Sequence, residues 1–124
     1  MVKFRYSDSA NADYLAALKT IREYFIEKNS TELGEKHIER FKTELKKREE
    51  IIIESPEFYS VRREYAPSRL GRLYRSFNVH WFVVFYTYDE ADGVVVWYIR
   101  SSRSDYSSII MLSEEVAGYG EHKE

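Results

Sequence analysis

Cysteine is missing from the sequence, and proline and glycine are scarce, with two and five residues among 124. Without cysteine the chain has no disulfide framework, no thiol nucleophile and no cysteine-ligated metal centre. Net charge is also nearly absent, at −2, which gives no general attraction to nucleic acid or to an anionic membrane. The longest apolar run, WFVVFY at residues 81–86, is too short to cross a bilayer. What remains is a single globular domain that is long enough to bury its own core.

Aromatic residues are abundant instead, since they make up 16% of the chain, eleven of them tyrosines, and gather in its second half. A hydrophobic fraction of 44% beside 32% charged residues is typical of a folded protein rather than a disordered one. The opening residues, MVKFRY, contain neither the apolar segment nor the cleavage site of a secretory signal. We therefore expect a cytoplasmic protein with no membrane partner.

Residues 8–54 follow a helical period. Ser7, Asp8 and Ser9 offer side-chain oxygens for an N-cap. Apolar residues then recur at three- and four-residue steps, first at Leu15, Leu18, Ile21 and Phe25, and after a break at residues 29–31 again at Leu33, Ile38, Phe41, Leu45 and Ile52. Two helices joined by so short a turn predict an antiparallel helical hairpin, which Ser55 and Pro56 end.

The remainder of the chain is predicted to form strands. A connection over residues 55–71 leads to strands at 72–77, 80–88 and 94–101, with a hairpin loop at 89–93 whose Gly93 suits a positive φ. Residues 2–6 alternate apolar and basic side chains and predict a further strand. The predicted fold class is α+β: an N-terminal strand, then an antiparallel helical hairpin packed on a mostly antiparallel twisted sheet of about four strands. We assign residues 1–112 to this one domain and expect residues 113–124 to be a mobile acidic tail.

Both faces of the predicted sheet are apolar. In the middle strand Trp81, Val83 and Phe85 alternate with Phe82, Val84, Tyr86 and Tyr88, and in the last strand Val95, Trp97 and Ile99 alternate with Val94, Val96 and Tyr98. A small antiparallel sheet normally has one polar face, because that face meets water. One helical hairpin covers one side, so we expect the chain's own residues 109–112 or a partner to cover the other. The alternative is that the two helices split across the two faces.

Arginine is concentrated around the first and last of these strands. Between residues 62 and 75 there are five arginines and a single acid, Glu64. Residues 55–110 contain seven arginines and no lysine. Arginine suits bidentate contact with carboxylates and phosphates. We predict that Arg75, Arg100 and Arg103 contact a target. For the other arginines, pairing with the glutamates of the helices is an equal alternative, and such exposed pairs contribute little.

Catalytic motifs are weak. His37, His80 and His122 lack the spacing of metal ligands, and we interpret each as structural or solvated. No serine lies in a nucleophile-elbow motif and no glycine-rich loop is suited to a phosphate, so no metal or cofactor is predicted. Metal-free RNA cleavage needs a base, a cation and an acid. Parts of that set are present at Arg75, Arg100, Arg103, Tyr106 and His80.

The predicted order of strand, helical hairpin, proline-containing loop and three antiparallel strands ending in IRSSRSDY resembles the RelE/ParE superfamily of toxins from type II toxin–antitoxin systems. The segments that carry the likeness are VKFRYSDSANADYLAAL, then APSRLGRLYRSFNVHWFVVFYTYDEADGVVVWYIR, and the strand end at residues 99–106. That strand end is similar to the ParE-type pattern hydrophobic–x–His–x–Arg–x–Asp. Arg103 and Asp105 match the pattern, and Ser101 replaces its histidine. The resemblance spans residues 2–112.

The resemblance also implies which residues a ribosome-dependent nuclease of the RelE branch would need. Such nucleases use lysines on the first paired strand, an arginine on the next, and an arginine and a tyrosine after the last. The corresponding positions here are Arg75 and Leu73 for the lysines, Phe82 for the first arginine, Arg103 or Ser104 for the second, and Ile109 or Ile110 for the tyrosine, with Tyr106 a rough substitute. Most of the nuclease set is therefore missing. Whether the protein is an enzyme stays open, with Arg75, Arg103 and Tyr106 as its residues if it is.

The ParE-like branch is favoured, which implies a plasmid-stabilisation type toxin that inhibits growth by binding DNA gyrase and is neutralised by an antitoxin. The alternatives are a RelE-like endoribonuclease that acts on mRNA at the ribosome, and a non-toxic adaptor of the same fold. A homodimer is a further expectation. The predicted target-binding residues are Arg72, Arg75, Arg100, Arg103, Asp105 and Tyr106. A disordered antitoxin segment that folds on binding suits an apolar surface, predicted at Phe82, Val84, Tyr86 and Tyr98 or at the groove between sheet and hairpin.

Overall fold

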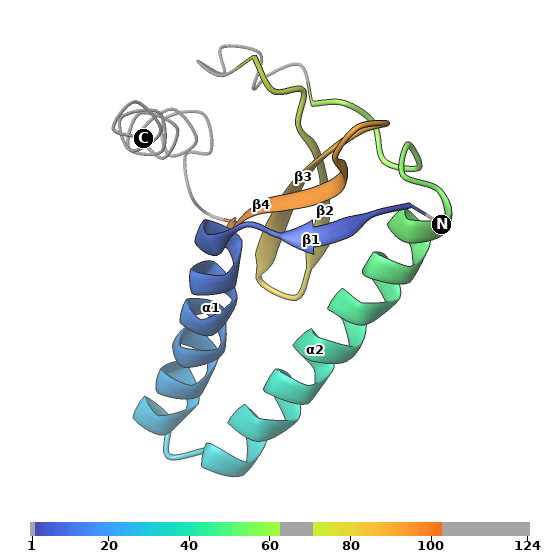
Figure 1. Cartoon of the computed structure of the whole chain (residues 1–124). Helices are drawn as coiled ribbons and strands as arrows, with labels where there is room; N and C mark the ends of the chain where they lie inside the picture. The colour runs from blue at the N-terminus through green and yellow to red at the C-terminus, as the bar shows by residue number, and fades with distance from the viewer. Residues whose placement is uncertain (1, 63–70, 103–124) are drawn as a thin grey trace.

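A four-stranded sheet carries a pair of long helices in the computed structural model, which describes residues 2–62 and 71–102 (Figure 1). The elements in chain order are β1 (Phe4–Tyr6), α1 (Asp8–Glu27), α2 (Thr31–Glu54), β2 (Arg75–Val79), β3 (Phe82–Asp89) and β4 (Gly93–Ser101). The strand order is β1-β4-β3-β2, with β1 parallel to β4 and the other pairs antiparallel. The predicted α+β class and its mostly antiparallel sheet are confirmed.

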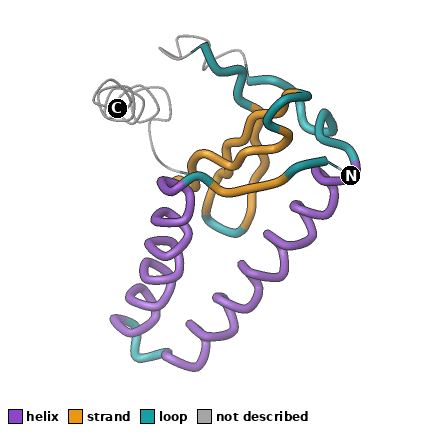
Figure 2. The backbone as a smooth tube through the Cα atoms, viewed as in Figure 1, coloured by secondary structure: helices purple, strands orange, loops and turns teal. Residues whose placement is uncertain are grey.

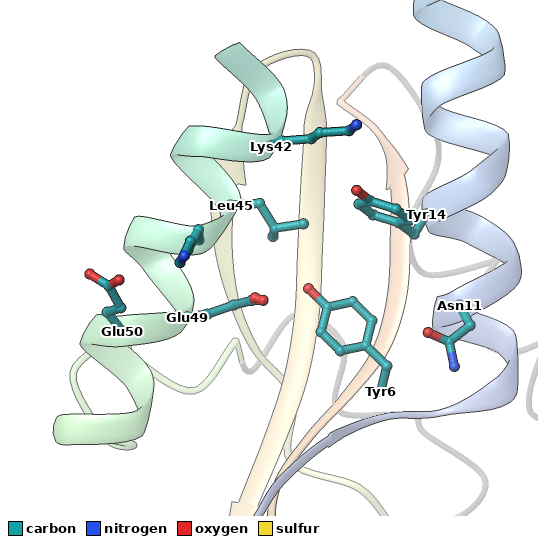
Figure 3. A pocket seen from close by; sticks show the side chains of 8 residues that line it. Tyr6, Asn11, Tyr14, Lys42, Leu45, Glu49 and Glu50 are labelled. Atoms are coloured by element: carbon teal, nitrogen blue, oxygen red, sulfur yellow. The ribbon is translucent and has the colours of Figure 1, made fainter. Parts of the chain in front are cut away.

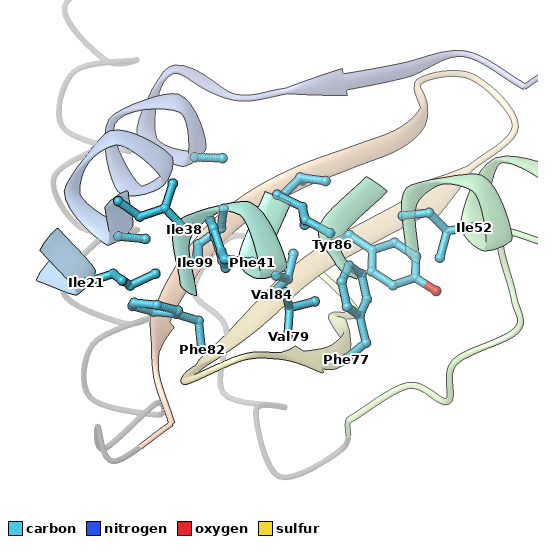
Figure 4. Packing of buried hydrophobic residues seen from close by; sticks show 14 of the residues in the cluster. Ile21, Ile38, Phe41, Ile52, Phe77, Val79, Phe82, Val84, Tyr86 and Ile99 are labelled. Carbon is cyan, nitrogen blue, oxygen red and sulfur yellow. The ribbon is translucent and has the colours of Figure 1, made fainter. Parts of the chain in front are cut away.

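Both helices lie on the same face of the sheet. A single buried cluster joins Ile21 of α1 and Phe41 of α2 to Phe77, Val84 and Val96 of the strands (Figure 4). We call this side of the sheet the helix face and the opposite side the far face. The alternative in which the helices split across the two faces is therefore wrong. The two helices meet at the turn around residues 28–30 and diverge toward β1 (Figure 2).

The helical stripes are largely as predicted, with two exceptions. The core side of α1 is formed by Ala10, Ala17, Ile21 and Phe25, and that of α2 by Gly34, Ile38, Phe41, Leu45 and Ile52. Leu15 is 65% exposed and Leu33 is 45% exposed, so the prediction that both belong to the buried stripes is wrong. Leu15 lies about 120° around the helix from Ile21, on the outer surface, given 100° per residue. The prediction assigned the larger apolar side chain, leucine, to the core, whereas in α1 the small side chains of Ala10 and Ala17 face it.

A β-bulge changes which residues of β4 share a face. Phe85 pairs with Tyr98 while its neighbour Tyr86 pairs with Val96, so Trp97 is the extra residue. The bulge breaks the simple alternation of the strand, as an inserted residue must. Tyr98 therefore joins Val83 and Phe85 on the far face, with Trp97 packed against them. Ile99 returns to the helix face, so the predicted grouping of the β4 residues is corrected from the bulge onward.

The start of α1 continues the edge of the sheet where β1 ends. Ser7 donates its backbone N–H to the carbonyl of Val96 (2.9 Å) and its hydroxyl to that of Trp97 (3.2 Å), and it accepts the N–H of Ala10 as the helix N-cap (3.0 Å). One and a half turns later, Asp13 Oδ2 accepts the N–H of Ile99 (2.9 Å). The side chains of Ser7 and Asp13 thus hydrogen-bond to backbone groups at the edge of β4. A longer β1 would have paired these groups instead.

The strand boundaries differ slightly from the prediction. The first of the three C-terminal strands begins at Arg75 rather than residue 72, and His80 and Trp81 form the turn that the prediction had placed inside the next strand. His80 has φ +54, a left-handed conformation that is uncommon outside glycine. Its N–H is donated to Glu44 of α2 (3.0 Å), which ties this turn to the hairpin. The predicted hairpin and its positive-φ glycine are confirmed, but its loop is shorter than predicted, because Asp89 and Gly93 pair with each other as strand residues.

Replacing Gly93 by alanine should destabilise the fold more than the same change at Gly71. Both glycines have a positive φ, +71 and +69, so both variants carry the left-handed strain of about 1 kcal/mol. A Cβ at Gly93 would also clash with the Lys3 carbonyl oxygen, whereas at Gly71 it meets no described residue within 4 Å. That oxygen accepts the Val94 N–H (2.8 Å), so β1 must shift and lose this bond. We expect Gly93→Ala to cost about 2–3 kcal/mol more than Gly71→Ala in urea unfolding. Equal losses would contradict the steric argument.

Removing the Asp13 carboxylate should also weaken the fold. Asp13→Ala leaves the Ile99 N–H without its acceptor and takes away a counter-ion that lies 3.3 Å from Arg100 Nε. We expect a loss of about 1–3 kcal/mol in the free energy of unfolding. Glu23→Ala is the matched control, because that acid forms an exposed pair with Lys19 on the same helix. This variant should change stability by less than about 1 kcal/mol. A similar loss in both variants would mean that Asp13 does not support β4.

Candidate functional site

A groove runs between the diverging helices and is also lined by Tyr6, the last residue of β1. Its cavity volume is about 450 Å³, within the range of binding pockets. We call it the interhelical groove (Figure 3). It is lined by Tyr6, Asn11, Tyr14, Lys42, Leu45, Lys46, Glu49 and Glu50.

The sequence builds this groove from three elements. Tyr6 is the last residue of β1, and Asn11 and Tyr14 lie in the first two turns of α1. On α2 the lining residues 42, 45, 46 and 49 follow the i, i+3, i+4, i+7 spacing of one helix face. Sequence analysis missed this stripe because three of its four residues are charged, and charged residues on a helix normally indicate a solvated surface.

Burial perturbs two groups in the interhelical groove. The Tyr6 hydroxyl is buried and lies beside Glu49, the nearest acid in the groove lining. Burial, followed by the negative charge of Glu49, raises the pKa of Tyr6 well above its ordinary value. Burial also raises the pKa of Glu49, against the opposing effects of Tyr6 and Lys46. Figure 3 shows the Tyr6 hydroxyl and the Glu49 carboxylate facing each other across the groove.

The far face of the sheet carries aromatic and cationic groups together. Tyr74, Val83, Phe85 and Tyr98 form a small buried cluster, and the partly buried Trp97 packs on it. The guanidinium carbon of Arg72 lies 3.5 Å from the centroid of the Trp97 ring, a close cation–π contact, and that of Arg5 lies at 5.8 Å. A pocket of about 350 Å³ opens beside this stack. The residues 109–112 that we expected to cover this face lie outside the described residues.

The arginines predicted to bind a target do not form one surface. Arg75 pairs with Tyr86 on the helix face, and its guanidinium donates to the carbonyls of Tyr59 (2.6 Å) and Glu57 (3.3 Å). Arg100 pairs with Val83 on the far face and reaches Asp13 of α1 (3.3 Å). Because directly opposite residues share a face, the two guanidiniums arise from opposite sides of the sheet. Both have structural partners, and of the predicted target-binding arginines that the structure describes, Arg72 and Arg100 belong to the far face.

The predicted antitoxin contacts are also divided between the two faces. Phe82, Val84 and Tyr86 are buried under the helices in the main core, and Tyr98 is buried on the far face. Their side chains therefore do not form a shared accessible surface. Alternation in the sequence separated the two faces of β3 correctly but gave no sign of which face the hairpin covers. The other predicted location was the groove between sheet and hairpin; the interhelical groove differs from it, because the two helices form its walls and Tyr6 is its only lining residue from a strand.

The positions of a RelE-like nuclease are occupied by side chains unsuited to that chemistry where the structure describes them. Leu73 is 65% exposed and apolar, and Phe82 is buried in the core. Arg75 fits the position of a catalytic cation, but it holds the carbonyls of residues 57 and 59. Arg103, Ser104, Asp105 and Tyr106, as well as residues 109 and 110, lie outside the described residues.

Two histidines that are distant in the sequence meet in the structure. His37 Nδ1 of α2 lies 2.8 Å from His80 Nε2 in the turn between β2 and β3. Burial and the neighbouring His37 and Arg40 lower the pKa of His80, although Glu44 acts in the opposite direction. The pair supports the interpretation of both histidines as structural, since it joins the turn to the hairpin.

Within residues 2–62 and 71–102, no three His, Asp or Glu side chains gather as metal ligands, and neither helix is apolar enough to span a membrane.

Removing the charge of Glu49 should stabilise the protein near neutral pH. The pKa of Glu49 is raised in the folded state, so the folded protein bears a cost for the ionised carboxylate that the unfolded chain does not. Glu49→Gln removes that cost at pH 7. The gain should disappear as the pH falls below the ordinary value of 4.5, because Glu49 is then protonated in both states. Urea unfolding between pH 4 and 8 measures this.

The exposed Glu90 in the hairpin between β3 and β4 provides the control. Glu90→Gln should change the free energy of unfolding at pH 7 by less than about 0.5 kcal/mol, as exposed substitutions usually do. A Glu49→Gln protein that is less stable than the wild type at pH 7 would show that the ionised carboxylate supports the fold.

Comparison with known proteins places the chain in a family. The family described as the ParE toxin of the type II toxin–antitoxin system, parDE, matches residues 4–106. Among curated proteins no relative matches the chain. The match covers β1, the helical hairpin and the three C-terminal strands, the same elements that form the described fold. The chain therefore belongs to the ParE toxin family of type II toxin–antitoxin systems.

Proposed function

We propose that this toxin inhibits growth by binding DNA gyrase in the cytoplasm, without catalysing a reaction itself, and that a cognate antitoxin neutralises it. Membership of the ParE toxin family supports the toxin role and implies the antitoxin. The observation that favours binding over RNA cleavage is which side chains occupy the positions that a RelE-like nuclease would use for catalysis. Leu73 and Phe82 carry no ionisable group, and the one cation among the described positions, Arg75, is held by two backbone carbonyls.

The far face is the proposed surface for the target. It presents Arg72 on the Trp97 ring and Arg100 at the end of β4, and aromatic and arginine side chains are the residues that most often dominate protein interfaces. Arg103, Asp105 and Tyr106 follow β4 directly in the sequence, and we propose that they extend this surface. Arg75 is left out of the proposal, because it lies on the helix face and holds the loop after α2.

The interhelical groove is the proposed surface for the antitoxin. It is open and lies on the side of the molecule formed by the two helices and β1, whereas the proposed target surface is on the far face of the sheet. An amphipathic segment that folds on binding suits a groove between helices, where a few side chains serve as anchors. This assignment replaces Phe82, Val84 and Tyr86, which the toxin's own helices cover.

Expression of the toxin without its antitoxin should distinguish the proposed target from the ribosome. We expect filamentous cells and a DNA-damage response, and we expect the purified protein to inhibit supercoiling by gyrase and to stabilise cleaved DNA. Rapid cleavage of mRNA in translating ribosomes would instead assign the nuclease function. Normal growth would indicate a non-toxic adaptor.

Substitution of arginines tests the target surface separately. The double variant Arg72→Ala and Arg103→Ala should weaken gyrase inhibition by about tenfold or more, since interface arginines commonly contribute over 1 kcal/mol each. Arg22→Ala is the matched control, because Arg22 lies on α1 in an exposed pair with Glu35 and should inhibit as the wild type does. A double variant with unchanged inhibition and an unchanged unfolding midpoint would exclude these arginines from the target surface.

A further inference from the structure

The interhelical groove holds a half-buried carboxylate, that of Glu49, beside the phenol of Tyr6. Glu49 is half-buried and forms no ion pair with the residues that the structure describes, although Lys46 lines the same groove. The buried Tyr6 hydroxyl beside it faces the Glu49 carboxylate. A carboxylate that is partly removed from water is normally paired with a cation or with hydrogen-bond donors. A cationic ligand would supply the counter-ion that Glu49 lacks among those residues.

The chemistry of this pair selects a cation with N–H donors. A carboxylate only accepts hydrogen bonds, and a phenol oxygen can accept one while its proton is donated to the carboxylate. The rings of Tyr6 and Tyr14 both line the groove, and aromatic faces attract guanidinium and ammonium groups. An arginine or lysine side chain therefore satisfies Glu49 and Tyr6 together. An acidic side chain placed there would meet Glu49 and the neighbouring Glu50 with like charge.

The shape of the groove favours a side chain on an elongated segment over a free small cation. Its α2 wall extends from Lys42 to Glu49 along one helix face, with Leu45 as the buried apolar contact between the charges. The positive charges of Lys42 and Lys46 lie toward one end and the negative charges of Glu49 and Glu50 toward the other. A partner segment with the opposite order of charges fits this wall in only one direction.

We infer that a lysine or arginine side chain of the antitoxin enters the interhelical groove and pairs with Glu49 beside Tyr6. This inference rests on the proposed function, which makes the groove the antitoxin surface. Glu49 is then a specificity-determining residue of the toxin. The cost of burying its charge in the free toxin is recovered when the antitoxin supplies the counter-ion.

The test measures the affinity of the toxin for its antitoxin, taken as the purified product of the open reading frame adjacent to the toxin gene. Glu49→Gln keeps the size of the side chain and removes only its charge. We expect this variant to bind the antitoxin about tenfold to a hundredfold more weakly by calorimetry. Glu90→Gln, at an exposed acid outside the groove, should bind as the wild type does. Circular dichroism and the unfolding midpoint at pH 7 establish that both variants are folded.

A double-mutant cycle then identifies the partner of Glu49. Each lysine and arginine of the antitoxin is changed to glutamine in turn and is measured against wild-type toxin and Glu49→Gln. One position should show a coupling of about threefold or more with Glu49, and the others should be additive. Unchanged affinity of folded Glu49→Gln, or additivity at every position, would overturn the inference while leaving the proposed function intact. Wild-type toxin that does not bind this antitoxin would overturn both, and a toxin dimer lost in Glu49→Gln would assign the groove to a second copy of the chain.

Discussion

The hydrogen bonds between the start of α1 and the edge of β4 fix the arrangement of the whole molecule. β1 is only three residues long, and beyond it the edge of β4 is satisfied by Ser7 and Asp13. These two residues hold the first turns of α1 beside β4 at a set distance. Because the turn to α2 is short, α2 must return across the same face. At the edge of β4, Ser7 and Asp13 thus take the place of further residues of β1. This local replacement places both helices on one side of the sheet.

This arrangement creates both candidate surfaces. The hairpin is closed at its turn and open at β1, so the space between the helices widens there into the interhelical groove. The far face, in turn, is left to aromatic side chains and arginines rather than to helices. The two surfaces lie on different sides of the sheet. An antitoxin can therefore act in two ways: it can extend over the far face and block the target sterically, or it can bind in the interhelical groove and alter the toxin's conformation from there. The length and sequence of the antitoxin decide between these two, since the toxin has a separate surface for each partner.

Much of the fold could be predicted from the sequence, because local signals agree with one another there. The turn at residues 29–31, the helical spacing from Ile21 to Ile52 and the Asp89–Gly93 hairpin each have a short-range cause. Long-range relations were not predictable from the pattern. A strand with two apolar faces contains no mark of which face a helix will cover, and the bulge at Trp97 is invisible in an unbroken run of β-forming residues. For the same reason Phe82, Val84 and Tyr86 were predicted to be contacts although they are core. Glu49 was missed because its importance arises from Tyr6, which is distant in the sequence but adjacent in the fold.

The arginines show why charge counted along a sequence overstates the charge available to a ligand. Among the residues that the structure describes, Arg75 is paired with two carbonyls rather than with an acid, and Arg100 is paired with the carboxylate of Asp13. Arg62 donates to Ser76, and Arg72 stacks on Trp97. Contact with ribosomal RNA depends on cations that neutralise phosphates. An arginine whose N–H donors are bonded within the fold has fewer donors left for a phosphate. A protein target is less demanding, because an arginine that is already stacked and oriented loses little entropy when a carboxylate binds it. The stack on Trp97 thus orients the Arg72 guanidinium within the folded toxin, before any partner binds.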